Sequence, residues 1–379
     1  MNSLIDHRSQ FPVTKQMIYL NAAGNVPPPV CVVEAVASFY RELSEKGEER
    51  RALEEKVDAA CTRFAELVNA SPAEVTIIKN TTEGLNIAAN GLPLSSGDNV
   101  VVSDLEHQNN VYPWLNLQRR KGVAMRILKS RQGRLALEDL DKIVDKRTRA
   151  LALSFVTLTG LKIDLKPFGR FCKSHNMYFI VDAIQGLGRL RLDVKDALID
   201  IMSCGGHKGL MAGRGIGCVY IDADIMDSVE VTYAGPPIEL RHAPVTSELQ
   251  LSGGAKKFNA GGANYPGVWA LNAGLEFLEK IGISSIEAYD LHLGRLLAQG
   301  LKKIEGVKIL SPLSIAESSG VVSFTTADNS RIAEDLASRK IKVSSRGGGI
   351  RVSPHFYNTE DEIFKTVEVL EELLSRSPG

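Results

Sequence analysis

The sequence has no net charge and no long apolar segment. Its 45 Lys and Arg residues balance its 45 Asp and Glu residues, so no overall field attracts nucleic acid or an anionic membrane. No apolar run is long enough to span a bilayer, and residues 1–16 lack the basic-then-apolar pattern of a secretory signal. We therefore expect a cytoplasmic protein that binds small molecules and neither nucleic acid nor membranes.

The chain has few cysteines, and their spacing argues against disulfide bonds. The number of cysteines is odd, and they are widely spaced, mostly among apolar residues: Cys31, Cys61, Cys172, Cys204 and Cys218. This pattern disfavours a disulfide framework or a zinc site. We expect these cysteines to be small core residues, and we expect no metal site.

Length and composition predict two domains. The chain has 379 residues, of which 44% are hydrophobic and 24% charged, as in soluble globular proteins with ample core. A connection rich in Gly and Pro leads up to Asn264. We predict a large domain over residues 15–264 and a smaller C-terminal α+β domain over residues 265–379, which also includes the N-terminal segment 1–14.

Short strands rich in Val, Ile and Leu alternate with helices in the large domain. This alternation predicts an α/β fold with a mostly parallel sheet covered on both faces. Ligands of such sheets bind beyond the carboxyl ends of the strands. Polar residues that follow apolar runs are therefore candidate site residues: Thr82, His107, Thr157, Asp182 and Gln185.

The strongest candidates for chemistry lie between Met177 and Tyr220. An apolar strand ends in Asp182, an Asp-x-x-Gln turn reaches Gln185, and a Gly-Gly-His-Lys block ends in Lys208. The glycines allow a ligand to approach the backbone closely. We interpret Lys208 as a Schiff-base lysine and Asp182 as the carboxylate that holds the ring nitrogen of pyridoxal 5′-phosphate.

The turn Asn80-Thr81-Thr82-Glu83-Gly84, between a strand and a helix, has two interpretations. Its free backbone N–H groups at the positive end of a helix suit a phosphate. It also fits an ordinary helix start, with Thr81 or Thr82 as the cap and Glu83 in the first turn. The residues alone leave both interpretations open.

Seven stretches, in order and spread over nearly the whole chain, carry a family resemblance: YLNAAGNVPPP, KNTTEGLN, SDLEHQNNVYPW, VDAIQGLG, GGHKGL, FNAGGAN and IRVSPHFYNTEDEI. They resemble the class V aminotransferase superfamily of fold-type I pyridoxal-phosphate enzymes. The similarity is strongest to its branch of cysteine desulfurases, cysteine and selenocysteine lyases and isopenicillin N epimerase. The resemblance implies a large domain with a mostly parallel seven-stranded sheet between helices. It also implies a homodimer with shared active sites, in which FNAGGAN crosses to the partner.

The resemblance implies roles for individual residues. Lys208 would bind the cofactor covalently and move the α-proton of an amino-acid substrate, and His107 would stack on the cofactor ring and assist proton transfer. Asp182 would keep the ring nitrogen protonated, and Gln185 would bond to the phenolic oxygen. The further cofactor-binding candidates are Thr81, Thr82, Thr157, His207 and Gly262.

Candidate substrate contacts are Arg351, Asn21, Arg346 and His355. The resemblance assigns Arg351 to the substrate carboxylate, which a guanidinium binds with two parallel hydrogen bonds. Arg346 and His355 could recognise a second acidic group, although surface roles fit charged residues at strand ends equally well.

The chain also departs from the family pattern. Desulfurases carry a nucleophilic cysteine shortly before this arginine, where the chain reads VSSRGGGIR, and no cysteine follows Cys218. The chain has Thr157 in the region of a family Asn, and Gly205 and Gly262 at two positions where the family has phosphate-binding hydroxyl residues.

These observations predict an enzyme that uses pyridoxal phosphate to remove the Cα proton of an amino acid. The favoured reaction is β-elimination by a C–S lyase of the cysteine-lyase type, without a persulfide cysteine. A class V aminotransferase and an isopenicillin N epimerase-like epimerase are the alternatives, because a fold does not fix the reaction. The presence of Lys208, Asp182, His107 and Arg351 together argues against a non-catalytic scaffold.

Overall fold

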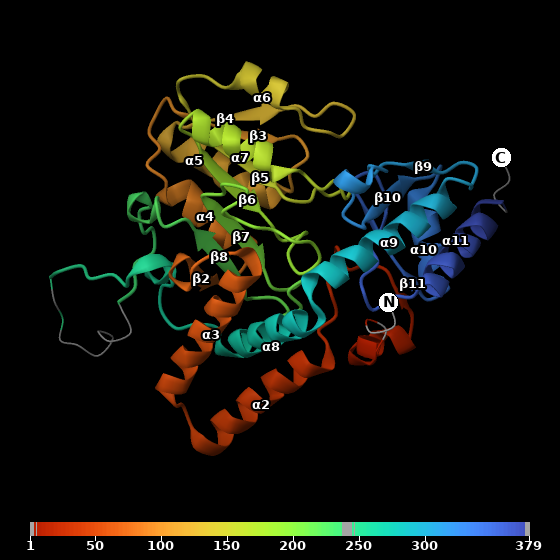
Figure 1. Cartoon of the computed structure of the whole chain (residues 1–379), viewed down its shortest axis with the longest axis horizontal. Helices are drawn as coiled ribbons and strands as arrows, with labels where there is room; N and C mark the ends of the chain where they lie inside the picture. The colour runs from red at the N-terminus through yellow and green to blue at the C-terminus, as the bar shows by residue number, and fades with distance from the viewer. Residues whose placement is uncertain (1–3, 5, 237–244, 246, 376–379) are drawn as a thin grey trace.

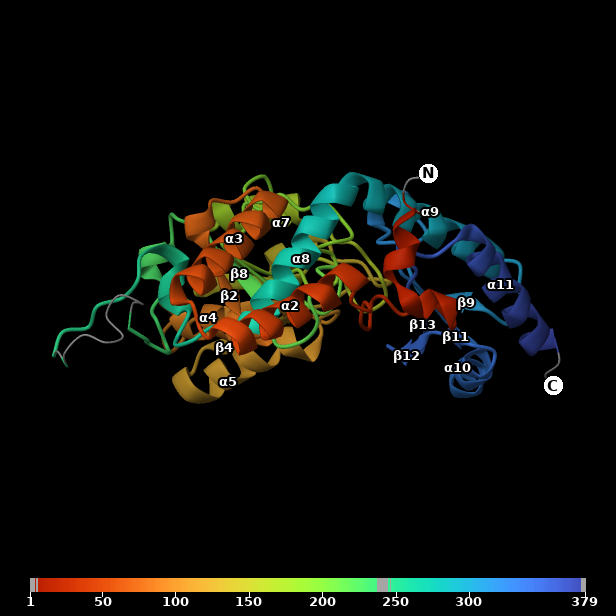
Figure 2. The same cartoon turned by 90° about the horizontal axis from the view of Figure 1, so that it is seen from below.

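The computed structural model of the protein describes residues 4, 6–236, 245 and 247–375. A large sheet with helices on both sides forms one part, and a smaller sheet with its own helices forms the other (Figure 1). The 3-10 helix Asp6–Gln10 and the last helix, α11 (Glu360–Ser375), both lie in the smaller part (Figures 1 and 2). None of the described helices is both long and apolar enough to cross a membrane.

The large sheet has the strand order β2-β8-β7-β6-β5-β3-β4. Strand β8 runs antiparallel to β2 and β7, and the other neighbouring strands are parallel. The predicted seven-stranded, mostly parallel sheet is confirmed. Its strands are β2 (Val75–Ile78), β3 (Asn99–Ser103), β4 (Ala124–Leu128), β5 (Thr148–Ser154), β6 (Tyr178–Asp182), β7 (Ile201–Gly205) and β8 (Gly217–Ile221).

Both faces of this sheet are covered because its strands are apolar at successive positions. Alternate side chains of a strand point to opposite faces. Val100 and Val102 of β3 pack in one apolar core with Leu85 and Trp114, whereas Val101 packs in the core on the other face. Helices α4 (Thr81–Gly91) and α5 (Tyr112–Lys121) cover the first face; α3 (Arg50–Val68), α6 (Leu137–Ile143), α7 (Leu165–Ser174) and α8 (Tyr265–Ile281) cover the second.

Several helices begin at a polar side chain that accepts a hydrogen bond from the first turn. Asn80 caps α4 by accepting from the N–H of Glu83 at 3.1 Å. Asp164, Asn264 and Asp328 cap α7, α8 and α10 (Asn329–Ser338) in the same way. The sequence interpretation that Thr81 or Thr82 caps α4 is therefore wrong, and Thr81 is free for another role.

Glycines with positive φ break the two longest helical stretches. The apolar pattern from residue 30 to 69 forms α2 (Val30–Lys46) and α3, separated after Gly47, whose φ is +78°. Gly282, with φ of +84°, separates α8 from α9 (Ile283–Leu301). Helix α8 runs alongside α2 and also packs on α3, whereas α9 packs on α11 (Glu360–Ser375) (Figures 1 and 2). The helix that follows Asn264 thus contacts the large part, and the domain boundary at 264 stays a prediction.

The smaller part contains a four-stranded antiparallel sheet with the order β12-β13-β10-β9. Its strands are β9 (Lys308–Ile309), β10 (Val322–Thr325), β12 (Ser344–Arg346) and β13 (Gly349–Val352). A separate parallel pair joins β1 (Ile18–Tyr19), near the start of the chain, to β11 (Ile341–Lys342).

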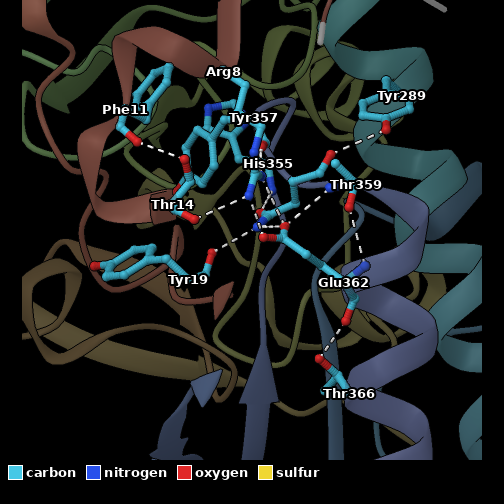
Figure 3. Close-up of polar contacts among 11 residues, drawn as sticks. Arg8, Phe11, Thr14, Tyr19, Tyr289, His355, Tyr357, Thr359, Glu362 and Thr366 are labelled. Carbon is cyan, nitrogen blue, oxygen red and sulfur yellow. Dashed lines mark hydrogen bonds and ion pairs between the residues drawn. The ribbon is translucent and has the colours of Figure 1, made fainter. Parts of the chain in front are cut away.

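The segment before β1 packs on the smaller part. It forms two short 3-10 helices, Asp6–Gln10 and Pro12–Lys15. Arg8 forms an ion pair with Glu362 of α11 at 2.6 Å, and the Phe11 ring packs on Tyr357 (Figure 3).

Candidate active site

One cavity of about 210 Å³ lies where the ends of β5 and β6 face the β12–β13 hairpin. Ser154 and Asp182 end the two strands, Thr81 begins α4, and Arg351 reaches the cavity from β13. The structure brings together these predicted site residues: Thr81, His107, Asp182, Gln185, His207, Lys208, Arg346 and Arg351. Ligands of parallel sheets bind at this edge.

Burial changes the acid–base properties of the two residues singled out from the sequence. Asp182 is 4% exposed, and burial raises its pKa to about 6 against the opposing effects of the Ile184 N–H and Lys208. Burial likewise lowers the pKa of the Lys208 amine to about 8, which the nearby Asp182 partly offsets. A carboxylate and an amine with converging pKa values thus face one cavity, as is typical of reactive sites.

His107 lies at the same cavity with a defined hydrogen-bonding state. Its Nδ1 atom accepts a hydrogen bond from the N–H of Asn109 at 3.1 Å, so the neutral ring carries its proton on Nε2. Burial is the main cause that lowers the pKa of His107, and the charges of Lys208, Arg346 and Arg351 add to it. Near pH 7 His107 is a neutral hydrogen-bond donor through Nε2.

Donors for an anion gather at the α4 end of the cavity. The Thr81 Oγ1 atom accepts a hydrogen bond from the N–H of Gly205 at 2.9 Å, which holds the first turn of α4 against β7. His207 and Arg214 line the same cavity, and burial together with the Lys208 and Arg214 charges lowers the pKa of His207 to about 4. A Cβ atom at position 205 would lie 3.1 Å from Thr81 Oγ1, so Gly205 keeps this contact open.

Arg351 is a buried cation without a protein partner. It is 2% exposed, and no described residue forms an ion pair or a side-chain hydrogen bond with its guanidinium, whose Nε atom is among the unpaired buried atoms. Burial, together with Arg346 and Arg189, lowers its pKa to about 10. Because an unpaired buried charge is costly, the cavity favours an anionic ligand at Arg351.

The structure does not bring three predicted cofactor-binding residues to this cavity. Thr82 lines a neighbouring groove with Asn86 and Tyr233, and Gly262 lines a third pocket with Asn264. Thr157 is buried, and its hydroxyl accepts a hydrogen bond from the N–H of Leu161 at 3.2 Å. A tight turn therefore uses the Thr157 hydroxyl, and the predicted contacts of Thr82 and Gly262 stay predictions.

Comparisons with known proteins agree with this geometry. The family model described as Aminotransferase class-V matches residues 18–365. The chain belongs to the class-V aminotransferase family.

Named relatives of this class-V chain are cysteine desulfurases. Probable cysteine desulfurases of Methanothermobacter thermautotrophicus and Pyrococcus abyssi are 29% and 30% identical to it, each match covering 97% of both chains. The apo structure of the cysteine desulfurase from Thermococcus onnurineus has a TM-score of 0.89 and 28% identity over 98% of both chains. The cystine C–S lyase C-DES, solved with cysteine persulfide, has a TM-score of 0.87 and 25% identity over 96% of this chain and 99% of its own.

These comparisons confirm the predicted fold-type I architecture and a pyridoxal-phosphate enzyme. The cavity of the class-V chain fits that cofactor chemically. Thr81, His207, Arg214 and the α4 N-terminus provide donors for a phosphate, and Asp182 provides a buried carboxylate for a ring nitrogen. The Lys208 amine provides the point of covalent attachment.

The cavity of the class-V chain also uses residues that sequence reasoning missed. Glu106, next to His107 in the chain, is buried and accepts hydrogen bonds from Ser103, Asn110 and Ser154, which fixes the loop that carries the histidine. In the sequence, only the position of Glu106 next to His107 could have pointed to it. The sequence could not identify Arg214 as a cavity residue, because an exposed arginine in a Gly-rich loop looks like any other surface charge.

Asn21 and His355, two predicted substrate contacts, do not line the cavity. Asn21 packs against Gly24, which itself lines the cavity, and the Asn21 Oδ1 atom is buried. Gln185 donates from Nε2 to the Ala23 carbonyl at 3.1 Å and thereby holds the same segment. His355 is fully buried, so its predicted contact with a substrate does not fit the structure.

His355 belongs instead to a buried charge network, which we call the Asp290 network (Arg189, Asp290 and His355). The Asp290 Oδ2 atom lies 2.9 Å from Arg189 Nε and 2.9 Å from His355 Nδ1. Arg189 also donates to the Pro354 carbonyl at 2.9 Å. The His355 N–H donates to Asn358, from which contacts continue to Glu362 and Arg8 (Figure 3).

We expect Asp290→Asn to lower the free energy of unfolding by about 3–5 kcal/mol, because it leaves the buried Arg189 charge without an anion. Urea denaturation of the purified holoenzyme measures this loss. The double variant Arg189→Met/Asp290→Leu should lose less, since an apolar pair leaves no unpaired charge. The exposed pair Arg51–Glu55 provides a control, where Arg51→Ala should cost less than about 1 kcal/mol. Equal stability of Asp290→Asn and the wild type would contradict the role of the network.

We expect the rate of covalent cofactor attachment to rise with pH and to level off above about pH 8. The reason is that only the neutral Lys208 amine attacks, and burial lowers its pKa to about 8. Mixing apoprotein with pyridoxal phosphate and following the yellow colour measures the rate. Asp182→Asn should move the midpoint to lower pH, because Asp182 raises the pKa of Lys208. A midpoint near the ordinary lysine pKa would contradict this assignment.

Proposed function

We propose that the protein is a C–S lyase that uses pyridoxal phosphate to split a sulfur-bearing amino acid by β-elimination, without a persulfide cysteine. The observation that carries this proposal is the position of the cysteines. All five lie among the described residues, and none lines the cavity. Cys61, Cys172, Cys204 and Cys218 are buried, and burial raises the pKa of each, so none is a ready nucleophile.

The remaining cysteine does not supply the missing nucleophile. Cys31 is half-buried in α2, outside the residues that line the cavity, and burial raises its pKa as well. A reaction that ends on a protein thiol therefore lacks support. An elimination needs no thiol, because the sulfur leaves with the product.

The side chains around the cavity provide what an elimination requires. Arg351 binds the α-carboxylate, which supplies the anion that its buried guanidinium lacks. Bound pyridoxal phosphate supplies an electron sink for the carbanion at Cα. The Lys208 amine takes the Cα proton, and the Nε2–H of neutral His107 donates a hydrogen bond to the departing sulfur, which takes up the proton that Lys208 removed. The Cα–H and Cβ–S bonds break, and addition of water yields an oxo acid, ammonia and a thiol.

The names of the relatives support a reaction at a C–S bond. The names of the relatives include cysteine desulfurases and a cystine C–S lyase, both of which act at a C–S bond. The class V aminotransferase and the epimerase use the same lysine and carboxylate clamp. An aminotransferase also needs an oxo-acid acceptor, and an epimerase needs a second proton donor on the opposite face. The geometry of Lys208 and His107 does not favour either of them over the elimination.

Product analysis tests the reaction. With L-cysteine or L-cystine and no oxo acid, the holoenzyme should release pyruvate and ammonia in equal amounts. His107→Ala should lower kcat about 10²–10³-fold because the departing sulfur loses its hydrogen-bond donor, whereas Arg351→Gln should mainly raise KM. Intact mass after turnover should show no sulfur added to the protein. A strict requirement for an oxo acid, or a protein persulfide, would overturn the proposal.

We further propose a homodimer with shared active sites. In support, Gly262 and Asn264 of the FNAGGAN segment line a pocket with Lys79 and Glu83, next to the start of α4. The molar mass of the holoenzyme, measured by light scattering, should be twice the 41.2 kDa of the chain. A monomer that binds cofactor and turns over cysteine would contradict this assembly.

A further inference from the structure

A second hollow, which we call the α9 groove, has a volume of about 430 Å³ and shares no lining residue with the candidate active site. One wall is a face of α9, whose residues recur at three- and four-residue spacing: Ala288, Leu291, Arg295, Ala298 and Lys302. The segment 311–318 and Val322 of β10, which packs beside α9, form the other wall (Figure 1).

The walls of the α9 groove are largely apolar. Leu291 and Ala298 contribute from α9, and Val322 contributes from β10. Leu313 and Ile315, on the opposite wall, are 49% and 67% exposed although both side chains are large and apolar. A ligand with an apolar body would cover these side chains and gain the hydrophobic free energy of that burial.

Positive charge in the α9 groove is not balanced by acid. Arg295 and Lys302 line it two helical turns apart, and no Asp or Glu is among the described residues that line it. The carboxylate of Glu360 is engaged by His292, whose Nε2 atom lies 2.8 Å from Glu360 Oε1. Arg295 Nη2 lies 3.1 Å from His292 Nδ1, and this is its contact inside the protein. The other N–H groups of the Arg295 guanidinium suit an anionic head group.

The α9 groove shares a wall with the candidate active site through hydrogen bonds. Ser311, which lines the groove, donates from its hydroxyl to the carbonyl of Thr159. Leu158, the residue before Thr159, lines the active-site cavity. The Ser319 hydroxyl donates to the Gly160 carbonyl at 2.8 Å and joins the same two segments. A ligand that holds the segment 311–318 therefore also holds the turn that carries Leu158.

We propose that the α9 groove is an effector site for a small carboxylate with an apolar body, such as a medium-chain acyl carboxylate. The apolar body lies between α9 and the segment 311–318, and the carboxylate binds Arg295 with the charge of Lys302 nearby. The volume favours a small molecule, because pockets for such ligands measure about 300–1,000 Å³, whereas a stable protein interface buries about 800 Å² on each partner. This inference is independent of the reaction that the active site performs.

Titration calorimetry with octanoate and its uncharged analogue 1-octanol tests the site on the holoenzyme. Octanoate should bind about 10-fold more tightly than 1-octanol, because charge-assisted hydrogen bonds hold its carboxylate. Equal affinities, or no binding of octanoate, would overturn the proposal.

Variants assign the binding to the α9 groove. Arg295→Gln should reduce the affinity for octanoate to that for 1-octanol, and Ala298→Trp should abolish binding of both by filling the groove. Lys303→Gln, which removes an exposed charge just outside the groove, should change neither affinity. Loss of octanoate binding in Arg351→Gln would place octanoate in the active-site cavity and overturn the proposal. A changed molar mass of Ala298→Trp would make the groove a contact between copies of the chain, with the same consequence.

Release of the cofactor tests the shared wall without any turnover. Octanoate should slow the release of pyridoxal phosphate from the holoenzyme about 5-fold, because the turn that carries Leu158 is held in place. Ser311→Ala should still bind octanoate but lose this effect, since the bond to Thr159 is gone. Release that octanoate leaves unchanged in the wild type would contradict the role of the site as an effector site. None of these measurements depends on whether the enzyme splits L-cysteine, so the proposed function stands or falls separately.

Discussion

The carboxylate of Asp290 joins the three segments on which the cavity depends. Arg189 follows the Asp182–Gln185 turn, Asp290 lies in α9, and His355 follows β13, and all three are almost completely buried. Such a pair contributes little stability relative to apolar side chains of similar volume, but it has only one satisfactory geometry. The Asp290 network therefore acts mainly on position: it fixes the strand that carries Arg351 relative to the turn that begins at Asp182.

Loss of solvent accounts for most of the chemistry in the cavity. The same burial raises the pKa of Asp182, lowers the pKa of Lys208 and keeps His107 and His207 neutral. The opposite charges of Asp182 and Lys208 only partly offset the pKa shifts of these two residues. The packing of the two parts thus prepares the site, because partial removal of water shifts the pKa values of these groups before any ligand binds.

Sequence reasoning was effective where function follows from local order along the chain. Asp182 and Lys208 were found because a strand end and a glycine-rich block are short-range features, and the strand alternation predicted the sheet. Arg351 was found through family resemblance alone. The Asp290 network was not predicted, because its bonds join residues 101 and 65 positions apart. Thr157 shows a further limit, since the direction of a hydroxyl depends on the turn that uses it.

The bonds of the cavity wall also constrain the order in which the protein can form. The Ala23 N–H binds the Ser353 hydroxyl across a separation of 330 residues, and Leu20 and Ala22 bond to the backbone of the same serine. During synthesis the amino end leaves the ribosome long before Ser353 exists, while the large sheet can already assemble from consecutive segments. The wall that carries Ala23 and Gly24 therefore closes last, and the nascent chain has no complete cavity until Ser353 has emerged.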